Sequence, residues 1–368
     1  MNFTMNKLRI AIIGTGGIAN AHINAYLQME DVEIVGGSDI IPGKARAFFD
    51  RYNLPDARDF EDTEEMLRTL KPDAVSVCTY NSTHAVCAIA ALRAGCHVLL
   101  EKPMTVTLED AQEIRRVEKE TGKIVTIGFQ PRYDGRMKKI KEIVQSGKLG
   151  KIYYIQTGGG RRRGIPGSTF IEKQYAGVGA LADIGCYSLD MVLNALGYPK
   201  PLTVSAVSYD YFGKNPKYNS EEDAKRFSVD DFCGAFIRLE GGITLDFRMS
   251  WAMHMDTTGS TIFLGTDAGL KVEPANPESL WGGAWDGSCG NVTLFHDEFG
   301  EPTSTPIPLH DAKEDRFFLK CRSFVDAVEQ NLPAPIPTSQ IIYNQAIIDG
   351  IIRSAECGHE VEIHVEEI

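Results

Sequence analysis

Three side chains in this sequence have the types and positions needed for acid–base chemistry on a hydroxyl group: Lys102, Asp183 and Tyr187. Lys102 follows an apolar run that predicts a buried strand, and it precedes Pro103, which restricts its backbone. An ammonium group at this place could hold the alkoxide that forms before a hydride leaves. Asp183 and Tyr187 are four residues apart in a predicted helix, so they share one face. A carboxylate and a phenol that converge on one point suit the binding and deprotonation of a polyol.

A glycine-rich turn near the N-terminus predicts a dinucleotide site. The apolar run 8–13 leads into a Gly-x-Gly-x-x-Ala pattern over residues 14–19, between a predicted strand and a predicted helix. In such a turn the first glycine permits the tight bend, and the second lets the backbone approach a pyrophosphate. The helix start offers free N–H groups to the phosphates. The residues expected to hold the phosphates are Gly14, Gly16, Gly17 and Ile18.

Asp39 and the segment 79–84 extend this predicted site along the same sheet edge. Asp39 ends the strand that follows the glycine turn. A carboxylate there accepts hydrogen bonds from ribose hydroxyls and repels a 2′-phosphate, so we expect NAD rather than NADP. The segment 79–84 follows another strand, at the place expected for contacts to the nicotinamide ribose, and its candidates are Thr79, Asn81 and His84. For His84, a purely structural place at a helix start is an equal alternative.

Arginine and aromatic residues later in the chain are candidates for substrate contact. Arg162 and Arg163 follow a glycine run after a predicted strand, and their guanidinium groups could bind a phosphate or a carboxylate. They could equally pair with acidic groups at a subunit contact of this acidic protein. The candidates for stacking on a sugar face are Trp251, His254, Trp281 and Trp285.

The elements that must position these residues fall into two halves. Residues 7–128 alternate short apolar runs with amphipathic helical patterns, which predicts an α/β Rossmann domain with a parallel sheet. From about residue 150, β-rich runs follow one another almost without helices, which predicts an α+β domain with a large, mostly antiparallel open sheet. We place the domains at 1–130 and 131–368, and we expect the final helix to pack back on the N-terminal domain. The helices predicted in the second half are Gly179–Leu196, Arg316–Gln330 and Ser339–Cys357.

Composition excludes several classes of protein. A chain of 368 residues exceeds one typical core, and 43% hydrophobic with 24% charged residues is typical of a globular protein. The net charge of −12 argues against nucleic acid or an anionic membrane as a partner. No apolar run reaches the length that spans a bilayer, and the N-terminus lacks a signal-peptide core, so we expect a cytoplasmic protein. The eight cysteines have no Cys-x-x-Cys spacing, which predicts reduced thiols, and we predict no metal site.

Together these motifs resemble the Gfo/Idh/MocA family, which includes glucose–fructose oxidoreductase and inositol dehydrogenases. The resemblance runs along nearly the whole chain, and Glu101-Lys102-Pro103 in this register is its most specific motif. It implies a Rossmann domain followed by an open-sheet domain, usually in dimers or tetramers, and reversible oxidation of a sugar or cyclitol hydroxyl with NAD(P). It also implies that Glu101, Lys102 and Gln130 contribute to the cofactor site. Most members carry histidine where this chain has Tyr187, and a minority carry tyrosine.

We therefore expect an NAD-dependent dehydrogenase that oxidises a ring hydroxyl of a neutral sugar or glycoside, with C3 as a candidate position. Tyr187 and Lys102 would form the proton acceptor pair, and Asp183 would orient the sugar. The alternatives are a redox-neutral enzyme that cleaves glycosides or exchanges hydride between sugars, and a cyclitol dehydrogenase. A non-catalytic regulator that responds to NAD is disfavoured because Lys102, Asp183 and Tyr187 are all present. We further expect a homo-oligomer, either a dimer or a tetramer.

Overall fold

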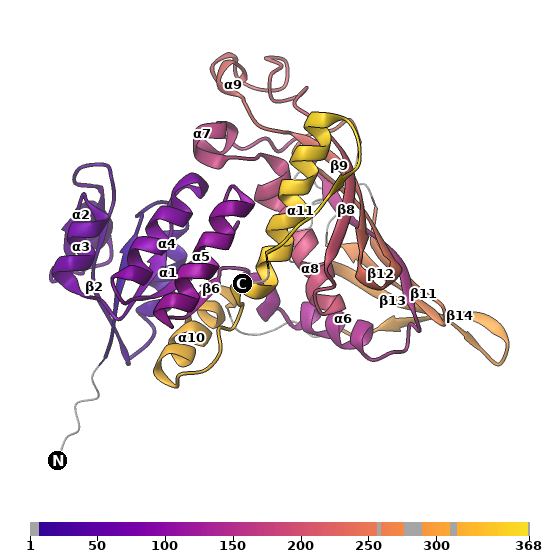
Figure 1. Ribbon diagram of the computed structural model, residues 1–368, viewed down its shortest axis with the longest axis horizontal. Coiled ribbons are helices and arrows are strands. Elements are labelled where there is room, and N and C mark those ends of the chain that lie inside the picture. Colours follow the sequence, from indigo (N-terminus) through magenta and orange to yellow (C-terminus); the bar gives the residue numbers. More distant parts are fainter. Residues whose placement is uncertain (1–6, 256–258, 276–288, 310–314, 367–368) are drawn as a thin grey trace. The chain divides into compact units, whose positions relative to one another are not determined.

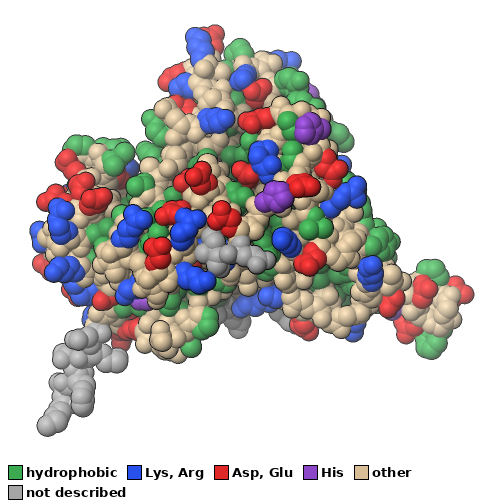
Figure 2. All heavy atoms as spheres, viewed as in Figure 1, with side chains coloured by type: hydrophobic (Ala, Val, Ile, Leu, Met, Phe, Trp, Pro, Cys, Tyr) green, Lys and Arg blue, Asp and Glu red, His purple; other side chains and the backbone are tan. Residues whose placement is uncertain are grey.

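The computed structural model describes residues 7–255, 259–275, 289–309 and 315–366 (Figure 1). The chain divides into two units, which are described separately below. The first comprises residues 1–130 and 314–342 together with 368, and the second comprises residues 131–313 and 343–367. On the face shown in Figure 2, basic and acidic side chains are interspersed.

The first unit is built around a parallel sheet of six strands in the order β3-β2-β1-β4-β5-β6. The strands are β1 (Leu8–Ile13), β2 (Val32–Ser38), β3 (Arg58–Phe60), β4 (Ala74–Val77), β5 (His97–Leu100) and β6 (Val125–Ile127). The helices between them are α1 (Ala19–Tyr26), α2 (Lys44–Arg51), α3 (Thr63–Leu70), α4 (His84–Arg93) and α5 (Leu108–Thr121). The strand order reverses between β1 and β4, and ligands of such sheets bind beyond the carboxyl ends of the strands at that point. The predicted Rossmann fold is confirmed.

The sequence of this unit explains why its elements form where they do. The residues of β4 are all buried, as expected for a central parallel strand that helices cover on both faces. Helix α5 begins where the Thr107 hydroxyl accepts a hydrogen bond from the Asp110 N–H, and it ends at Gly122 in the left-handed conformation. Local signals therefore set the ends of this helix.

A helix from the C-terminal part of the chain completes the first unit. Helix α10 (Arg316–Glu329) packs on α1, and its residues Phe324 and Val325 share a buried cluster with Ile10 and Tyr26. The sequence analysis placed this helix in the second domain. It belongs to the first unit because its apolar face covers a core that α1 and the sheet leave open.

The second unit contains a nine-stranded sheet in the order β14-β13-β12-β11-β7-β10-β9-β8-β15. Neighbouring strands are antiparallel except β7 and β10, which run parallel. The strands are β7 (Ile152–Gly160), β8 (Pro201–Tyr209), β9 (Phe232–Leu239), β10 (Ile243–Ser250), β11 (Thr261–Gly265), β12 (Ala268–Pro274), β13 (Cys289–Glu298), β14 (Glu301–Ile307) and β15 (Val361–Glu362). The predicted large, mostly antiparallel sheet is confirmed, although β12, β14 and β15 were not recognised in the sequence.

Helices cover one face of this sheet. They are α8 (Cys186–Leu196) and α11 (Thr338–Cys357), which lie along the strands in Figure 1. Helix α6 (Gly135–Gln145) packs on α8, and the short helices α7 (Lys173–Ala176) and α9 (Glu221–Arg226) lie in the connections between strands. Phe247 on β10 points toward α8, and Gly350 of α11 lies against Val204 of β8. On the opposite face Phe236 and Phe295 stay 44% and 46% exposed.

The longest apolar segment of the second unit lies in its core. Residues Lys173–Leu196 are long and apolar enough to cross a membrane by length and composition, but 89% of the most apolar window is buried inside the structure. This is the position of a core helix.

Candidate functional site

The turn after β1 provides the space that a dinucleotide needs. Gly14 has φ 85°, and a Cβ there would lie 2.8 Å from the Cys78 carbonyl oxygen, so the fold itself requires glycine. At Gly16 and Gly17, in contrast, a Cβ would meet no described atom within 4 Å. Helix α1 follows its N-cap residue Ile18, and the apolar side chain of Ile18 cannot accept a hydrogen bond from the first N–H groups of the helix. The open space and the uncapped helix start fit a bound pyrophosphate.

Asp39 directly follows β2, beside this turn, and is 7% exposed. Its Oδ2 accepts hydrogen bonds from the Thr15 N–H and hydroxyl, both at 2.9 Å, and lies 2.9 Å from the Lys44 Nζ. Burial alone would raise the pKa of Asp39, but the hydrogen bonds from Lys44 and Thr15 outweigh it and lower the pKa below the usual value. Asp39 is therefore an oriented carboxylate at the expected ribose position. Lys44, at the start of α2, was not among the residues predicted for this site.

The turn after β4 contains candidates with different surroundings. Thr79 and Asn81 are partly exposed. His84 is 1% exposed, and its Nδ1 donates a hydrogen bond of 2.8 Å to the Pro103 carbonyl. Burial lowers the pKa of His84, so the ring is neutral. His84 therefore holds the neighbouring turn through its Nδ1, as the structural alternative for this residue expects.

The turn after β5 presents Lys102 and buries Glu101. Lys102 is partly exposed, and its bond to Pro103 is cis. Glu101 is 4% exposed, and its Oε1 lies 2.8 Å from the His22 Nε2 and is also paired with the Lys320 ammonium. Burial would raise the pKa of Glu101, but Lys320 and His22 hold it well below the usual range. The predicted role of Glu101 as a cofactor contact is wrong, because this carboxylate is committed to a buried ion pair.

Gln130, the remaining residue predicted to contact the cofactor, begins the short helical turn Gln130–Tyr133 after β6 and is partly exposed. This turn follows the carboxyl end of β6, and the role of Gln130 in the cofactor site stays a prediction.

In the second unit, Asp183 and Tyr187 are the two partly exposed residues in a buried stretch of chain. Every other residue from 176 to 195 is buried. Residues Leu181–Gly185 form a turn of π-helix that continues into α8, and π-helical turns are frequent at functional sites. The structure therefore presents a carboxylate and a phenol together on the one accessible part of this segment, as the four-residue spacing predicts.

Trp251 orients the Asp183 carboxylate. Its indole N–H donates a hydrogen bond of 3.1 Å to the Asp183 Oδ2. The Trp251 side chain is 0% exposed, so the prediction that it stacks on a sugar is wrong. It is buried because it follows β10 into the core, where its ring packs edge-on against Phe227. Trp251 instead holds Asp183 in one orientation.

Asp230 fixes the start of the same helical segment. Its carboxylate accepts hydrogen bonds from the N–H groups of Gly179 at 2.7 Å and Leu181 at 2.9 Å. A Cβ on Gly179 would lie 1.9 Å from the Asp230 carbonyl oxygen, so this close approach requires glycine. Burial raises the pKa of Asp230 to about 6, and the nearby charge of Asp183 adds to the effect. The sequence analysis did not identify this residue.

Arg163 and His254 come together because β7 and β10 are parallel neighbours that end at the same sheet edge. The Arg163 Nη2 lies 3.3 Å from the His254 Nδ1. The Arg163 guanidinium lies over the rings of Tyr218 and Phe212, at 4.7 and 5.4 Å from their centroids. Both rings belong to the long connection between β8 and β9, where the sequence analysis saw no site. These contacts hold Arg163 in a fixed place beside His254.

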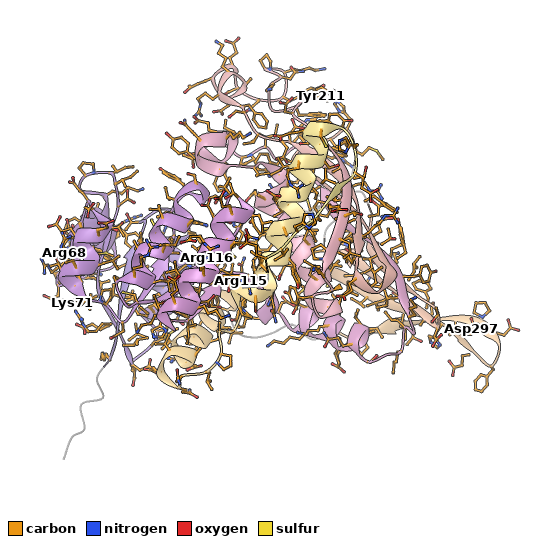
Figure 3. All side chains as sticks on the ribbon, in the orientation of Figure 1. Arg68, Lys71, Arg115, Arg116, Tyr211 and Asp297 are labelled. Atoms are coloured by element: carbon orange, nitrogen blue, oxygen red, sulfur yellow. The ribbon has the colours of Figure 1, made fainter. Side chains whose placement is uncertain are left out.

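The remaining candidates for substrate contact are either exposed or lie outside the described residues. Arg162 is exposed. Tyr211 projects from the β8–β9 connection, where it is labelled in Figure 3, and stacks on Tyr209 with a centroid distance of 5.3 Å. Trp281 and Trp285, which were predicted to stack on a sugar, lie outside the described residues. Among the residues that are described, no group of three or more His, Cys, Asp or Glu side chains could hold a metal ion.

Comparisons with known proteins match the chain along most of its length. Residues 8–129 match the model of an oxidoreductase family with an NAD-binding Rossmann fold, GFO_IDH_MocA, and residues 137–271 match the GFO/IDH/MocA C-terminal domain. The chain is 31% identical to D-glucoside 3-dehydrogenase of Escherichia coli K12 over 98% of its own length and 99% of that protein. It is 35% identical to inositol 2-dehydrogenase of Salmonella paratyphi B, over 39% of this chain and 43% of that protein.

Among solved structures, aldose–aldose oxidoreductase from Caulobacter crescentus superposes with a TM-score of 0.77 at 22% identity. The match covers 97% of this chain and 100% of that one, and at this identity it shows the shared fold alone. The family model that matches residues 8–129 agrees with the Rossmann fold of the first unit. The chain belongs to the GFO/IDH/MocA family of NAD-binding oxidoreductases.

Proposed function

We propose that this enzyme is an NAD-dependent dehydrogenase that oxidises a ring hydroxyl of a glycoside, at C3. The observation that carries the proposal is the pair Asp183 and Tyr187, which are the partly exposed residues in an otherwise buried segment. A carboxylate and a phenol on one face suit a polyol, in which neighbouring hydroxyls are donors and acceptors. The full-length relative, a D-glucoside 3-dehydrogenase, supports the substrate class and the position of oxidation.

Each residue of the proposed site has a distinct role. The backbone at Gly16 and Gly17 holds the pyrophosphate of NAD, and Asp39 binds its ribose hydroxyls. Bound NAD supplies the hydride acceptor. Tyr187 accepts the proton of the reacting hydroxyl. Asp183, oriented by the Trp251 N–H, binds the neighbouring hydroxyls of the sugar.

Lys102 completes the proposed chemistry. Its ammonium group stabilises the alkoxide that develops as the hydroxyl proton leaves, since a preorganised cation acts most strongly where charge develops. Because the ammonium group acts on the alkoxide that develops in the transition state, loss of Lys102 is expected to lower kcat more than it raises KM.

The test is NAD reduction, followed at 340 nm, with methyl glucoside, glucose, glucuronate, glucose phosphate and myo-inositol. We expect the highest kcat/KM with the glycoside and a loss of about 100-fold or more in Tyr187→Phe, which is the usual contribution of a general base. Tyr211→Phe is the matched control, because that phenol is 70% exposed on the β8–β9 connection. A loss below tenfold in Tyr187→Phe across the pH range would refute its role. No reduction of NAD with any of these compounds would refute the dehydrogenase and favour a redox-neutral reaction.

We also infer that the enzyme is a homo-oligomer that associates through the open face of its nine-stranded sheet. Val207 and Phe236 lie on the neighbouring strands β8 and β9 and are 45% and 44% exposed, and Phe295 of β13 on the same face is 46% exposed. Exposed apolar side chains that gather on one face are typical of interaction surfaces. Sedimentation of the wild type and of Phe236→Glu tests the inference. A wild type that sediments as a monomer would refute it.

A further inference from the structure

A buried ion pair joins the C-terminal part of the first unit to the strand end that presents Lys102. Lys320 of α10 and Glu101 are 219 positions apart in the sequence, and their side chains are 1% and 5% exposed. Glu101 is also 2.8 Å from the His22 Nε2. Burial lowers the pKa of His22 to about 4, so the histidine is neutral and the charges on Lys320 and Glu101 compensate one another.

This pair belongs to a polar network inside the apolar core. The His22 Nδ1 lies 3.0 Å from the Ser76 hydroxyl, and that hydroxyl is 2.7 Å from the Tyr26 phenol. His22 and Tyr26 both lie on α1, and Ser76 lies on β4. The network therefore holds the Glu101 carboxylate from α10, α1 and β4.

The same carboxylate lies against the backbone of the turn that contains Lys102. The Glu101 Oε2 accepts a hydrogen bond of 3.3 Å from the Lys102 N–H. A Cβ on Gly128 would lie 2.7 Å from the Glu101 Oε1, so the carboxylate fills the space between the ends of β5 and β6. On the other side of the turn, the His84 Nδ1 donates to the Pro103 carbonyl. Two buried side chains thus hold the backbone on both sides of Lys102.

We propose that Lys320 is a positioning residue for catalysis: through Glu101 it fixes the turn that aims the Lys102 ammonium. This proposal rests on the role of Lys102 in the proposed function. Without the Lys320 cation, a carboxylate in this place loses its strongest partner and is free to rotate or to take up a proton. In either case the acceptor for the Lys102 N–H is no longer held, and the turn has more than one conformation.

Stability alone is a poor explanation of this ion pair. Taking two charges out of water is costly, and apolar residues of similar volume often replace buried ion pairs without loss of stability. The best-attested role of buried charged groups is to select one conformation of the protein over alternative conformations. The conformation that the Lys320–Glu101 pair can select is that of the adjacent turn at Lys102, because the Glu101 carboxylate accepts a hydrogen bond from the Lys102 N–H.

The experiment uses the full-length enzyme and two matched double variants. Lys320→Met alone leaves a buried carboxylate unpaired and is expected to fold poorly, so the informative variant is Lys320→Met with Glu101→Gln, which removes both charges and keeps both shapes. The control is Arg322→Met with Asp31→Asn. Arg322 lies two residues along α10, and its Nη1 donates to both Asp31 oxygens at 2.8 Å. The side chains of this pair are 21% and 28% exposed, so the control removes an ion pair of α10 nearer the surface.

We expect the Lys320/Glu101 double variant to bind NAD within threefold of the wild type and to lose at least tenfold in kcat with little change in the KM for glycoside. We expect the Arg322/Asp31 double variant to keep kcat within twofold, even where its melting temperature falls. Two outcomes would overturn the proposal: a folded Lys320/Glu101 variant with kcat within threefold of the wild type, or an equal loss of kcat in the control. Failure of the proposed function is separate, because it would appear as unchanged kcat in Lys102→Ala.

Discussion

Replacement of Trp251 by phenylalanine tests whether this residue acts on the sugar only through Asp183. The indole N–H is 3.1 Å from the Asp183 Oδ2, and the side chain is fully buried. Phenylalanine removes the donor and keeps most of the apolar contact, including the edge-on packing against Phe227. The Asp183 carboxylate then loses the hydrogen bond that holds it in one rotamer.

The size of the effect follows from the kind of hydrogen bond that is lost. Hydrogen bonds to charged groups contribute about 1.5–3 kcal/mol, and 1.4 kcal/mol corresponds to about tenfold in rate. If the whole contribution serves to orient Asp183, kcat/KM falls by about 10- to 100-fold. The free energy of unfolding is expected to fall by about 1–3 kcal/mol, since a buried hydrogen bond is lost and a small cavity is left.

The assay is a double-mutant cycle with glycoside and saturating NAD, in which Trp251→Phe is made in the wild type and in Asp183→Ala. In the Asp183→Ala background the tryptophan has no carboxylate to orient, so its replacement should change kcat/KM by less than twofold. Equal losses in the two backgrounds would refute the reasoning, because Trp251 would then act on the sugar without Asp183. An unchanged kcat/KM in the single variant would refute it as well.

Three further predictions concern the cofactor turn and the helix start. Gly16→Ala should leave the melting temperature unchanged and raise the KM for NAD at least tenfold, because a Cβ there meets no described protein atom within 4 Å but fills the space for the pyrophosphate. Lys44→Ala should lower kcat/KM for NADP about tenfold more than it lowers kcat/KM for NAD. The Lys44 ammonium lies 2.9 Å from the Asp39 carboxylate and offsets the repulsion between that carboxylate and the 2′-phosphate of NADP. Asp230→Asn should change how stability depends on pH between about 4 and 6. Burial raises the pKa of Asp230 from 3.8 to about 6, so its contribution to stability is fully present below pH 4 and is lost as the pH rises to about 6, by up to about 3 kcal/mol.

Each of these predictions has its own control. Gly14→Ala should lower the melting temperature, unlike Gly16→Ala, because its Cβ would meet the Cys78 carbonyl oxygen. A parallel loss of NAD and NADP activity in Lys44→Ala would show that the lysine serves only to orient Asp39. For Asp230→Asn, urea unfolding at pH 4, 5, 6 and 7 gives the difference in stability from the wild type. A difference that stays constant over this range would contradict the raised pKa.

Much of the cofactor site follows from local sequence. The turn at Gly14 and Gly16, and the carboxylate of Asp39 at the end of the next strand, depend on the strand–turn–helix pattern and on short-range geometry. Asp183 and Tyr187 share one face because they are four residues apart, and four residues are about one turn in an α-helix and in a π-helix alike. For these features the neighbours that matter lie within a few residues, so their positions could be predicted.

The tertiary structure decided which of the predicted residues can meet a ligand and which hold others in place. The partners of Glu101 and Asp183 are Lys320 and Trp251, which are 219 and 68 residues away in the chain. Nothing local marks such a lysine or tryptophan, because its burial depends on how strands and helices pack after they form. For the same reason α10 was assigned to the wrong part of the chain: its apolar face is visible in the sequence, but the core that it covers is not. Residue type and spacing thus determined the chemistry available to this protein, and long-range packing determined which side chains are free to perform it.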